Sequence, residues 1–329
     1  MKSYTLLCFF LALAMIICPL CSVKKATDAI SNELFKNDSV ENAELNAAIK
    51  ADDATVKIMS ANSKNITEVG LREYLIGAAA AEMSPVYHEE AVKAQIIASH
   101  TMLEYSKLHK SDDLNGADIS DSSGTHQGYI STDVQKEKWG ENYEKYRKKI
   151  EKCVDEVIGL TLQYNGEPIT AAFHAISNGK TENASDVWGG NYPYLISVTS
   201  DGDKLSPDYS SEVSVSADEF KDAVEKQGAV LGEDASKWIE EIKRTPTGMV
   251  KEITIGGKAF KGMDIRSYFS LKSSTFNYTF KDGGFIFAVS GYGHGVGMSQ
   301  YGADFMARQG FSYKEILEHY YPGTALVKN

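Results

Sequence analysis

The sequence predicts an α+β fold, in which helices and short antiparallel strands surround one cleft behind an N-terminal membrane anchor and a stalk. Three observations support this class. Helical periodicity dominates residues 71–157, short strand-like runs with turn signals follow from residue 160 to about 289, and two short helical segments close the 329-residue chain. Helices and strands that are segregated along a chain in this way are typical of α+β domains.

The N-terminal segment contains the one long apolar run of the sequence, an uncharged stretch from Tyr4 to Ser22. It is long enough to cross a bilayer, and it lacks the short core and A-x-A-like end of a secretory signal. We therefore predict a transmembrane anchor over 1–25, a polar stalk over 26–53 and the folded domain over 54–329, while a cleaved signal remains the alternative. Lysines on both sides of the run encode its orientation only weakly.

Composition argues against nucleic-acid partners and against sites built from cysteines. The formal net charge of -11 argues against a nucleic-acid partner. Three of the four cysteines lie in the apolar run, and only Cys153 lies beyond it. The folded domain therefore has no intramolecular disulfide and no zinc site built from cysteines.

The central stretch of the sequence reads as two helices, from about Leu71 to Met83 and from Glu89 to His109, separated at Ser84–Pro85. On the first helix an apolar stripe ends in a carboxylate, Glu82, after Gly77 and four alanines that would let another backbone approach closely. Burial and the negative end of a helix both raise the pKa of a carboxyl, so Glu82 is a candidate general acid. A surface glutamate on a frayed last turn is the alternative.

The remaining elements follow from turn and capping signals. A strand is expected at Thr55–Met59, a loop containing His126 at Lys110–Thr132, and one charged helix from Gln135 to Val157. Further expectations are a hairpin of Leu160–Tyr164 with Ile169–Phe173, a capping box at Ser216, a hairpin over Val250–Phe260, strands at Phe276–Phe280 and Phe285–Val289, and helices at Ala303–Gln309 and Tyr313–Tyr320.

Other residue patterns allow either chemistry or a purely structural role. The glycine-dense run GYGHGVGMSQYG (291–302) permits close approach to a ligand but equally suits a tight structural turn, and it lacks the spacing of a phosphate loop. The histidines at 100, 126, 174 and 294 show no close ligand pair, and no G-x-S-x-G motif indicates a serine nucleophile. Trp188 and Tyr194 suit sugar stacking, although most of the aromatic residues are expected in the core.

Four stretches together resemble the stage II sporulation protein D family. They are EYLIGAAAAEMSP followed by EAVKAQIIASHT, FHAISNGKTENASDVWGG followed by YPYL, GKAFKGMDIRSYFSLKSSTF, and GYGHGVGMSQYGA. The resemblance covers about Thr55 to Thr324. It implies a peptidoglycan lytic transglycosylase of endospore-forming bacteria, related to the amidase enhancers, whose cleft is catalytic.

The resemblance also implies roles for individual residues. It makes Glu82 the catalytic acid and assigns substrate-cleft positions to Lys93, His100, Thr181 and Tyr194; Ser177 and Gln300, polar residues of two loops, are further candidate substrate contacts. Lys93 could orient substrate or hold charge near Glu82.

The sequence departs from the family pattern at three places. The family usually has arginine where this chain has His100, so a permanent cation is replaced by a side chain that can be neutral. His100 either lines the cleft with Glu82 or faces the helix-packing core. Ser84 separates Met83 from the proline. Ser120 stands where some members have a zinc-binding cysteine, so we predict no metal and no cofactor.

The resemblance implies a mechanism and a setting. Glu82 would protonate the glycosidic oxygen, and the C6 hydroxyl of the N-acetylmuramic acid would attack its own C1 to give a 1,6-anhydro product. The expected substrate is glycan stripped of stem peptides, and the expected partners are a sporulation amidase or endopeptidase and a membrane scaffold protein during forespore engulfment. The domain would lie outside the cytoplasm, between the mother-cell and forespore membranes. A non-catalytic module that binds peptidoglycan and activates an amidase is the alternative.

Overall fold

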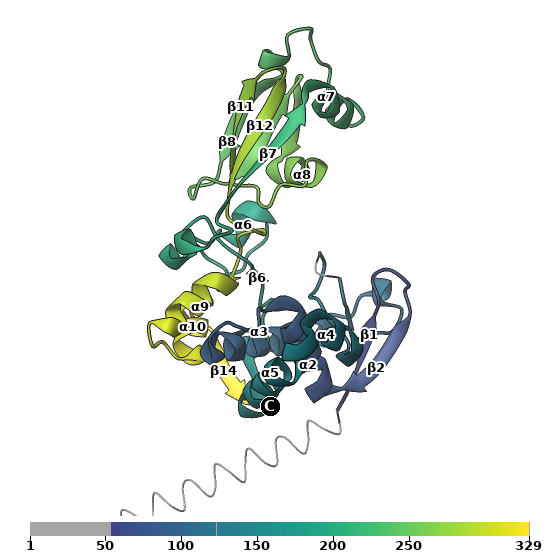
Figure 1. Cartoon of the computed structure of the whole chain (residues 1–329), viewed down its shortest axis with the longest axis vertical. Coiled ribbons are helices and arrows are strands. Elements are labelled where there is room, and N and C mark those ends of the chain that lie inside the picture. Colours follow the sequence, from purple (N-terminus) through teal and green to yellow (C-terminus); the bar gives the residue numbers. More distant parts are fainter. Residues whose placement is uncertain (1–53, 123, 329) are drawn as a thin grey trace, which may run out of the picture. The chain divides into compact units, whose positions relative to one another are not determined.

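Two consecutive helices, α2 (Leu71–Glu82) and α3 (Glu89–Leu108), form the centre of the computed structural model, which describes residues 54–122 and 124–328 (Figure 1). They confirm the two predicted helices to within one residue at each end. Helix α2 ends before Ser84 because the following proline disfavours helical backbone there. Helix α3 is buried over most of its length and packs against α2, α5, α9, α10 and β4.

The charged segment after the long loop forms two helices where one was predicted. Helix α4 spans Thr132–Trp139 and α5 spans Tyr143–Val157, with a 3-10 turn, η2, at Gly140–Asn142 between them. The chain breaks at Gly140, whose φ of 50° is readily accessible only to glycine. Trp139, Tyr143, Tyr146 and Ile150 are spaced in the sequence as one stripe of a continuous helix, and this stripe crosses the bend. Helix α5 packs on α2 and α3.

Two small sheets flank the helices. Strand β1 (Thr55–Met59) pairs antiparallel with β2 (Ile66–Gly70) and parallel with β3 (Ile119–Ser120). Strand β4 (Leu160–Tyr164) pairs with β5 (Glu167–Pro168) and with the C-terminal β14 (Ala325–Lys328).

The first predicted hairpin was right in its turn and wrong in its second strand. Asn165 and Gly166 have φ of 52° and 86°, as a two-residue hairpin turn requires. The returning strand ends at Pro168, which cannot donate to a continuing ladder. Residues 173–174 instead form β6 (Phe173–His174), which pairs parallel with β13 (Met298–Ser299).

The middle of the chain builds two antiparallel sheets around one apolar core. Strands β7 (Ser210–Ser216), β11 (Phe276–Lys281) and β12 (Gly284–Ser290) form the first, and β8 (Ile239–Arg244), β9 (Val250–Ile255) and β10 (Lys258–Lys261) form the second. Helices α7 (Ala217–Glu225) and α8 (Gly262–Tyr268) lie beside them in Figure 1, and stacked rings such as Phe220 on Phe285, 4.1 Å between centroids, fill the core. The predicted capping box at Ser216 is confirmed.

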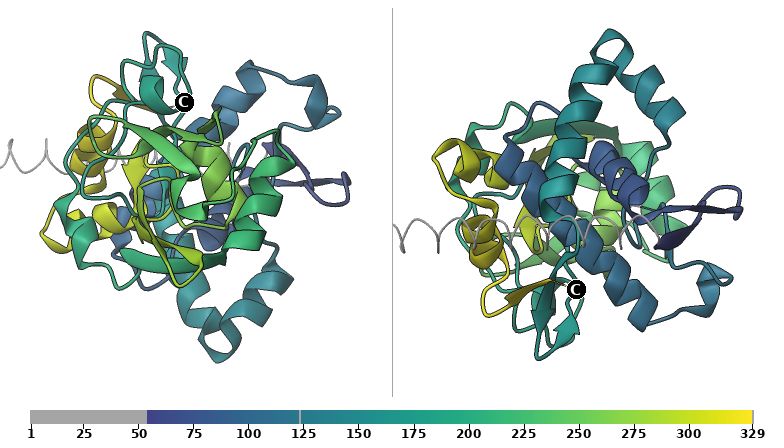
Figure 2. Two further views of the ribbon diagram at one scale, coloured as in Figure 1. Left: turned by 90° about the horizontal axis from the view of Figure 1, so that it is seen from above. Right: turned by 90° about the horizontal axis from the view of Figure 1, so that it is seen from below.

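The C-terminal helices return to the helical part. Helix α9 (Gln300–Arg308) and α10 (Tyr313–Tyr320) pack on each other and on α3 (Figures 1 and 2). The remaining short elements are α6 (Ala184–Val187) and the 3-10 turns η1 (Asp112–Leu114), η3 (Asp201–Leu205) and η4 (Ala235–Lys237).

The fold is thus a mixture of helices and small, mainly antiparallel sheets, as predicted, with two short parallel pairings that were not. Within residues 54–122 and 124–328, none of the helices has the length and apolar character needed to cross a membrane. The predicted anchor and stalk, residues 1–53, lie outside the described residues.

Candidate active site

Glu82 is the last residue of α2 and is half-buried. The small residues that precede it allow the loop after His126 to lie directly on the helix. A Cβ on Gly77 would stand 2.3 Å from the Tyr129 ring, and the Ile130 N–H donates to the Gly77 carbonyl at 3.2 Å. The predicted close approach of another backbone to this face is therefore confirmed.

This loop supplies a hydrogen-bond donor to the acid. The backbone N–H of Gly128 donates to Oε1 of Glu82. A Cβ at residue 128 would stand 2.9 Å from that oxygen and 3.1 Å from Cβ of Ala81, so only glycine allows this approach without displacement. The Gly128 backbone and the Glu82 carboxyl thus hold each other in place.

The loop is anchored by the residue before Gly128. Gln127 is buried, and its Nε2 donates to the Ser99 carbonyl at 2.9 Å and to the Tyr74 hydroxyl. The ring of Tyr74 also stacks on Tyr129, with 6.0 Å between centroids and 11° between planes. The position of the Gly128 N–H is therefore set by contacts with both α2 and α3.

Gln300 approaches the same carboxyl from the C-terminal part of the chain. It is the first residue of α9, and its side chain hydrogen-bonds to Glu82 in the direction that favours the ionised acid. Its Nε2 also donates to Oε1 of Gln95 on α3 at 3.3 Å. Of the residues predicted from the sequence, Gln300 is the one that the structure brings to Glu82.

The electrostatics of the site favour a proton on Glu82. Burial raises the pKa of its carboxyl, and the Gly128 N–H, the Gln300 side chain and the Lys138 ammonium oppose that shift without cancelling it. Lys138 donates to the carbonyl of Ala80 at 3.2 Å and so caps the end of α2, whose last turn has no basic residue. Glu82 therefore combines the raised pKa and fixed geometry of a general acid.

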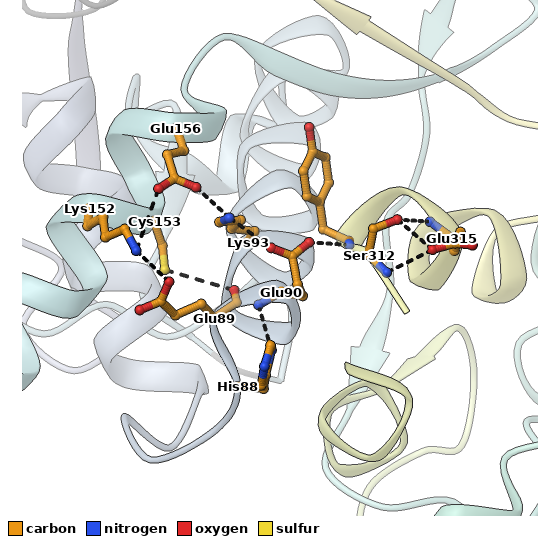
Figure 3. Close-up of polar contacts among 10 residues, drawn as sticks. His88, Glu89, Glu90, Lys93, Lys152, Cys153, Glu156, Ser312 and Glu315 are labelled. Carbon is orange, nitrogen blue, oxygen red and sulfur yellow. Dashed lines mark hydrogen bonds and ion pairs between the residues drawn. The ribbon is translucent and has the colours of Figure 1, made fainter. Parts of the chain in front are cut away.

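Lys93 lies in a different environment, near the start of α3. Figure 3 shows its ammonium between the carboxylates of Glu90, at 2.8 Å, and Glu156. Glu90 also accepts from the backbone N–H of Tyr313 at 2.7 Å. Lys93 thus ties α3 to α5 and α10, and the cation that acts on Glu82 is Lys138 instead.

His100 occupies the second of the two positions considered for it, the helix-packing core. It is 4% exposed, and its Nδ1 lies 3.1 Å from the Leu160 carbonyl of β4. Burial lowers its pKa to about 4, against the opposing effect of Glu104, whose Oε1 is 4.0 Å from Nε2. His100 is therefore neutral at physiological pH.

The other three predicted residues, Ser177, Thr181 and Tyr194, are buried and bonded within the protein. Thr181 is fully buried, and its hydroxyl accepts from the Val198 N–H at 2.9 Å. The Tyr194 hydroxyl accepts from the Thr170 N–H at 3.3 Å. Ser177 is also buried and donates its N–H to Asp203, which accepts from the Ser299 hydroxyl at 2.7 Å.

Sequence reasoning missed Gly128, Gln127 and Lys138. The sequence indicates only a possible zinc site in the loop after His126, whereas in the structure Gly128, Tyr129 and Ile130 of this loop meet the small-residue face of α2. His126 itself places Nε2 3.5 Å from the Ser106 hydroxyl. In the part of the chain that the structure describes, no three metal-ligating side chains are grouped together.

Fold and site define an α+β protein with a single half-buried acidic side chain held by a backbone N–H at the end of a central helix. The family model described as "Stage II sporulation protein" matches residues 60–164, which include Glu82 and the Gly128 loop. The chain belongs to the stage II sporulation protein D family and is therefore associated with sporulation.

Curated relatives show how far the similarity extends. The chain is 36% identical over 280 residues to stage II sporulation protein D of Bacillus subtilis (strain 168), covering 84% of this chain and 80% of the relative. For the protein of the same name from Bacillus amyloliquefaciens the identity is 37% over 277 residues, covering 84% and 79%. The amidase enhancer of Bacillus subtilis (strain 168) is 29% identical over 299 residues, covering 75% of this chain and 39% of the relative.

Proposed function

We propose that the protein is a lytic transglycosylase that cleaves the bond between N-acetylmuramic acid and N-acetylglucosamine in peptidoglycan. The observation that carries the proposal is the environment of Glu82. Its pKa is raised by burial, and it is held by the Gly128 N–H and by Gln300. This arrangement suits a proton donor that must afterwards act as a base.

The reaction needs one acid/base group. Glu82 donates its proton to the glycosidic oxygen as the bond to C1 breaks, and the C6 hydroxyl of the same muramic residue attacks C1. The Glu82 carboxylate then takes the proton of that hydroxyl, which restores the acid and leaves a 1,6-anhydro end. The Gly128 N–H and the Gln300 side chain stabilise the transient carboxylate.

The number of carboxylates distinguishes this reaction from ordinary hydrolysis. Most glycosidases use two carboxyl groups, one to protonate the leaving group and one to activate water or form a covalent intermediate. The groups that act on the pKa of Glu82 within the described residues are Gly128, Gln300 and Lys138, none of which is a carboxylate. An internal nucleophile removes the need for the second group, because intramolecular attack has an effective concentration of roughly 10⁵–10⁸ M when well oriented.

The setting of the activity is part of the proposal. Kinship with Bacillus sporulation proteins and with an amidase enhancer supports a role in cell-wall remodelling. We place the domain outside the cytoplasm, between the mother-cell and forespore membranes, held by the predicted anchor at 1–25 and acting in engulfment. Its partners are glycan strands freed of stem peptides, an amidase or endopeptidase that frees them, and a membrane scaffold protein.

The test is direct detection of the product. The full chain, purified in a mild detergent, is incubated with denuded glycan strands, and the products are analysed by mass spectrometry for anhydro-muramic ends. Wild-type protein should produce them, and Glu82→Gln should lower the rate by ~10²–10⁴ because the amide cannot transfer the proton. Activity of Glu82→Gln within a few-fold of wild type would exclude Glu82 as the acid.

Kinship with the amidase enhancer supports a second candidate, a module that binds peptidoglycan and activates an amidase without cutting glycan. A second incubation, of intact peptidoglycan with an added amidase, separates the two. Release of stem peptides that this protein accelerates equally as wild type and as Glu82→Gln, with no anhydro ends formed, would favour the binding module.

A further inference from the structure

Gln95, on α3, is a fully buried polar side chain that takes no part in the proposed reaction. Its Oε1 accepts from Nε2 of Gln300 on α9 at 3.3 Å, and its own Nε2 donates to the Ser99 hydroxyl, also at 3.3 Å. A buried amide is costly unless its donor and acceptor ends are both paired. The bonds to Gln300 and Ser99 therefore determine which way the Gln95 amide points.

The bond from Gln95 fixes the direction of the Gln300 amide as well as its place. The donor and acceptor ends of an amide have nearly the same shape, so packing alone hardly distinguishes its two orientations. Because Gln95 accepts one hydrogen of the Gln300 nitrogen, the second hydrogen of that nitrogen is left for the Glu82 carboxyl. Reversing the Gln300 amide would turn its oxygen towards the Gln95 oxygen, and two acceptors cannot bond.

The direction of the Gln300 amide matters most when Glu82 has lost its proton. An N–H that points at a carboxylate stabilises it, whereas a carbonyl oxygen in the same place repels it. Gln300 is one of the groups that oppose the rise in the pKa of Glu82 caused by burial, beside the Gly128 N–H and the Lys138 ammonium of α4. A freely turning Gln300 amide would weaken this opposition.

We propose that Gln95 is a positioning residue, which holds the N–H end of the Gln300 amide towards Glu82 so that this amide supports the carboxylate in the second half of the reaction. Gln95 acts through Gln300 and not by contact with the acid. The catalytic role of this contact rests on the proposed function, whereas its effect on the Glu82 carboxyl does not.

The test replaces Gln95 by methionine, which keeps the unbranched shape of glutamine and removes its strong acceptor. The Gln300 amide is then free to turn, so the pKa of Glu82 should rise by about one unit. The measurement is a pH titration of the full chain in a mild detergent, followed by carbon-13 NMR of glutamate labelled at the side-chain carboxyl. The resonance that disappears in Glu82→Gln identifies the acid.

A double variant tests the route through Gln300. The pKa of Glu82 should also rise in Gln300→Met, and in Gln95→Met/Gln300→Met it should rise no further, because the amide that Gln95 orients is already absent. A further rise in the double variant overturns the inference, as does an unchanged pKa of Glu82 in Gln95→Met. If Gln95→Met does not fold, Ser99→Ala takes its place: it removes the hydroxyl that orients Gln95, and an unchanged pKa of Glu82 there overturns the inference equally.

Thr101→Val is the matched control for the loss of a buried polar group on α3. Thr101 is fully buried, and its hydroxyl donates to the Ile97 carbonyl at 2.7 Å and accepts from the Leu162 N–H of β4 at 2.8 Å. This variant should lower the melting temperature and leave the pKa of Glu82 in place. An equal rise of that pKa in Thr101→Val would show that a loosened helix is the cause and would overturn the positioning role.

The electrostatic surroundings of Glu82 stay constant in this comparison. Lys138 and Tyr74 interact electrostatically with Glu82, and both are unchanged in each variant. The substitutions at positions 95, 99, 101 and 300 exchange one uncharged side chain for another. A change in the pKa of Glu82 therefore reports a change in its hydrogen bonds and not in the charges around it.

Activity measurements keep this inference apart from the proposed function. If the wild type forms anhydro-muramic ends, the limb on which kcat/KM falls at high pH should move upward in Gln95→Met together with the pKa of Glu82. A raised pKa in Gln95→Met, with a wild type that forms no anhydro ends, overturns the proposed reaction and leaves the positioning of Gln300 standing. Anhydro ends formed by the wild type, with an unmoved pKa in Gln95→Met, overturn the positioning and leave the reaction standing.

Discussion

Replacing Gly128 by alanine tests whether the loop controls the acidity of Glu82. The new Cβ would stand 2.9 Å from Oε1 and 3.1 Å from Cβ of Ala81, distances that force the carboxyl or the loop to move. The backbone itself tolerates alanine, because the φ of residue 128 lies outside the left-handed region. The change therefore removes the Gly128 hydrogen bond to Glu82 with little backbone strain.

The expected size of the effect follows from that one bond. A hydrogen bond to a charged group contributes about 1.5–3 kcal/mol, and one pKa unit corresponds to about 1.4 kcal/mol. The bond favours the ionised form of Glu82, so its loss should raise the pKa of Glu82 by about 1–2 units. A proton donor must be protonated, so the limb on which kcat/KM falls at high pH should move upward by the same amount. The plateau should fall several-fold, because a weaker acid donates its proton less readily.

The assay is the pH dependence of kcat/KM for release of anhydro-muramic ends. Gly124→Ala is the matched control, since a Cβ there would meet only the Ser122 hydroxyl, at 3.7 Å. Its profile should coincide with that of the wild type. A high-pH limb that does not move in Gly128→Ala, in a protein with unchanged melting temperature, would refute the assignment of the limb to Glu82 or of the loop to its control.

Three further predictions concern stability. Lys93→Met leaves the carboxylates of Glu90 and Glu156 facing each other and should destabilise the protein by about 1–3 kcal/mol, seen as a lower melting temperature. The high-pH limb of the kcat/KM profile should stay in place. A shift of this limb would show that Lys93 acts on the active site. Burial holds the pKa of His100 at about 4 against 6.5 in the unfolded chain, so the residue contributes up to about 3 kcal/mol to the free energy of unfolding above pH 6.5, and this contribution is lost as pH falls towards 4. His100→Gln should therefore lose less stability than the wild type on acidification, as measured by urea titration. Equal losses in the two proteins would contradict this. Gly297→Ala should destabilise the protein far more than Gly310→Ala. Both glycines have positive φ, but only the Cβ at residue 297 would stand 1.9 Å from a carbonyl oxygen, that of Ala172. Similar melting temperatures of the two variants would show that this oxygen moves freely.

Local patterns were enough to predict the elements that carry Glu82. The apolar stripe, the small residues and Pro85 determine α2 and its end through interactions between near neighbours. The capping box at Ser216 and the Asn165–Gly166 turn were found for the same reason. The single helix predicted over 135–157 failed because periodicity does not register a glycine that reverses the backbone at Gly140.

Contacts between distant segments could not be read from the sequence in the same way. The resemblance assigns Lys93 to the substrate cleft near Glu82, but the side chain points towards α5 and α10, where Glu156 and Tyr313 lie. Gln300 was found through its loop, whereas Gly128, the donor that reaches Glu82, belongs to a loop with no periodic signal. Which backbone amide meets a carboxyl depends on tertiary packing, and no local pattern encodes it.

The inner side of α3 explains how two distant loops meet at one carboxyl. Gln95 and Ser99 are fully buried on α3, and Gln95 donates to the Ser99 hydroxyl at 3.3 Å. Gln95 accepts from Gln300, and the Ser99 carbonyl accepts from Gln127, the residue before Gly128, so the two hydrogen-bond donors of Glu82 are tied to the same turn of α3. Buried polar groups are costly unless they are paired, so an apolar side chain at position 95 would leave the Gln300 amide without this partner. The Ser99 carbonyl belongs to the backbone and would still accept from Gln127. The Gln95 side chain and the Ser99 carbonyl therefore hold Gln300 and the Gly128 loop beside the acid.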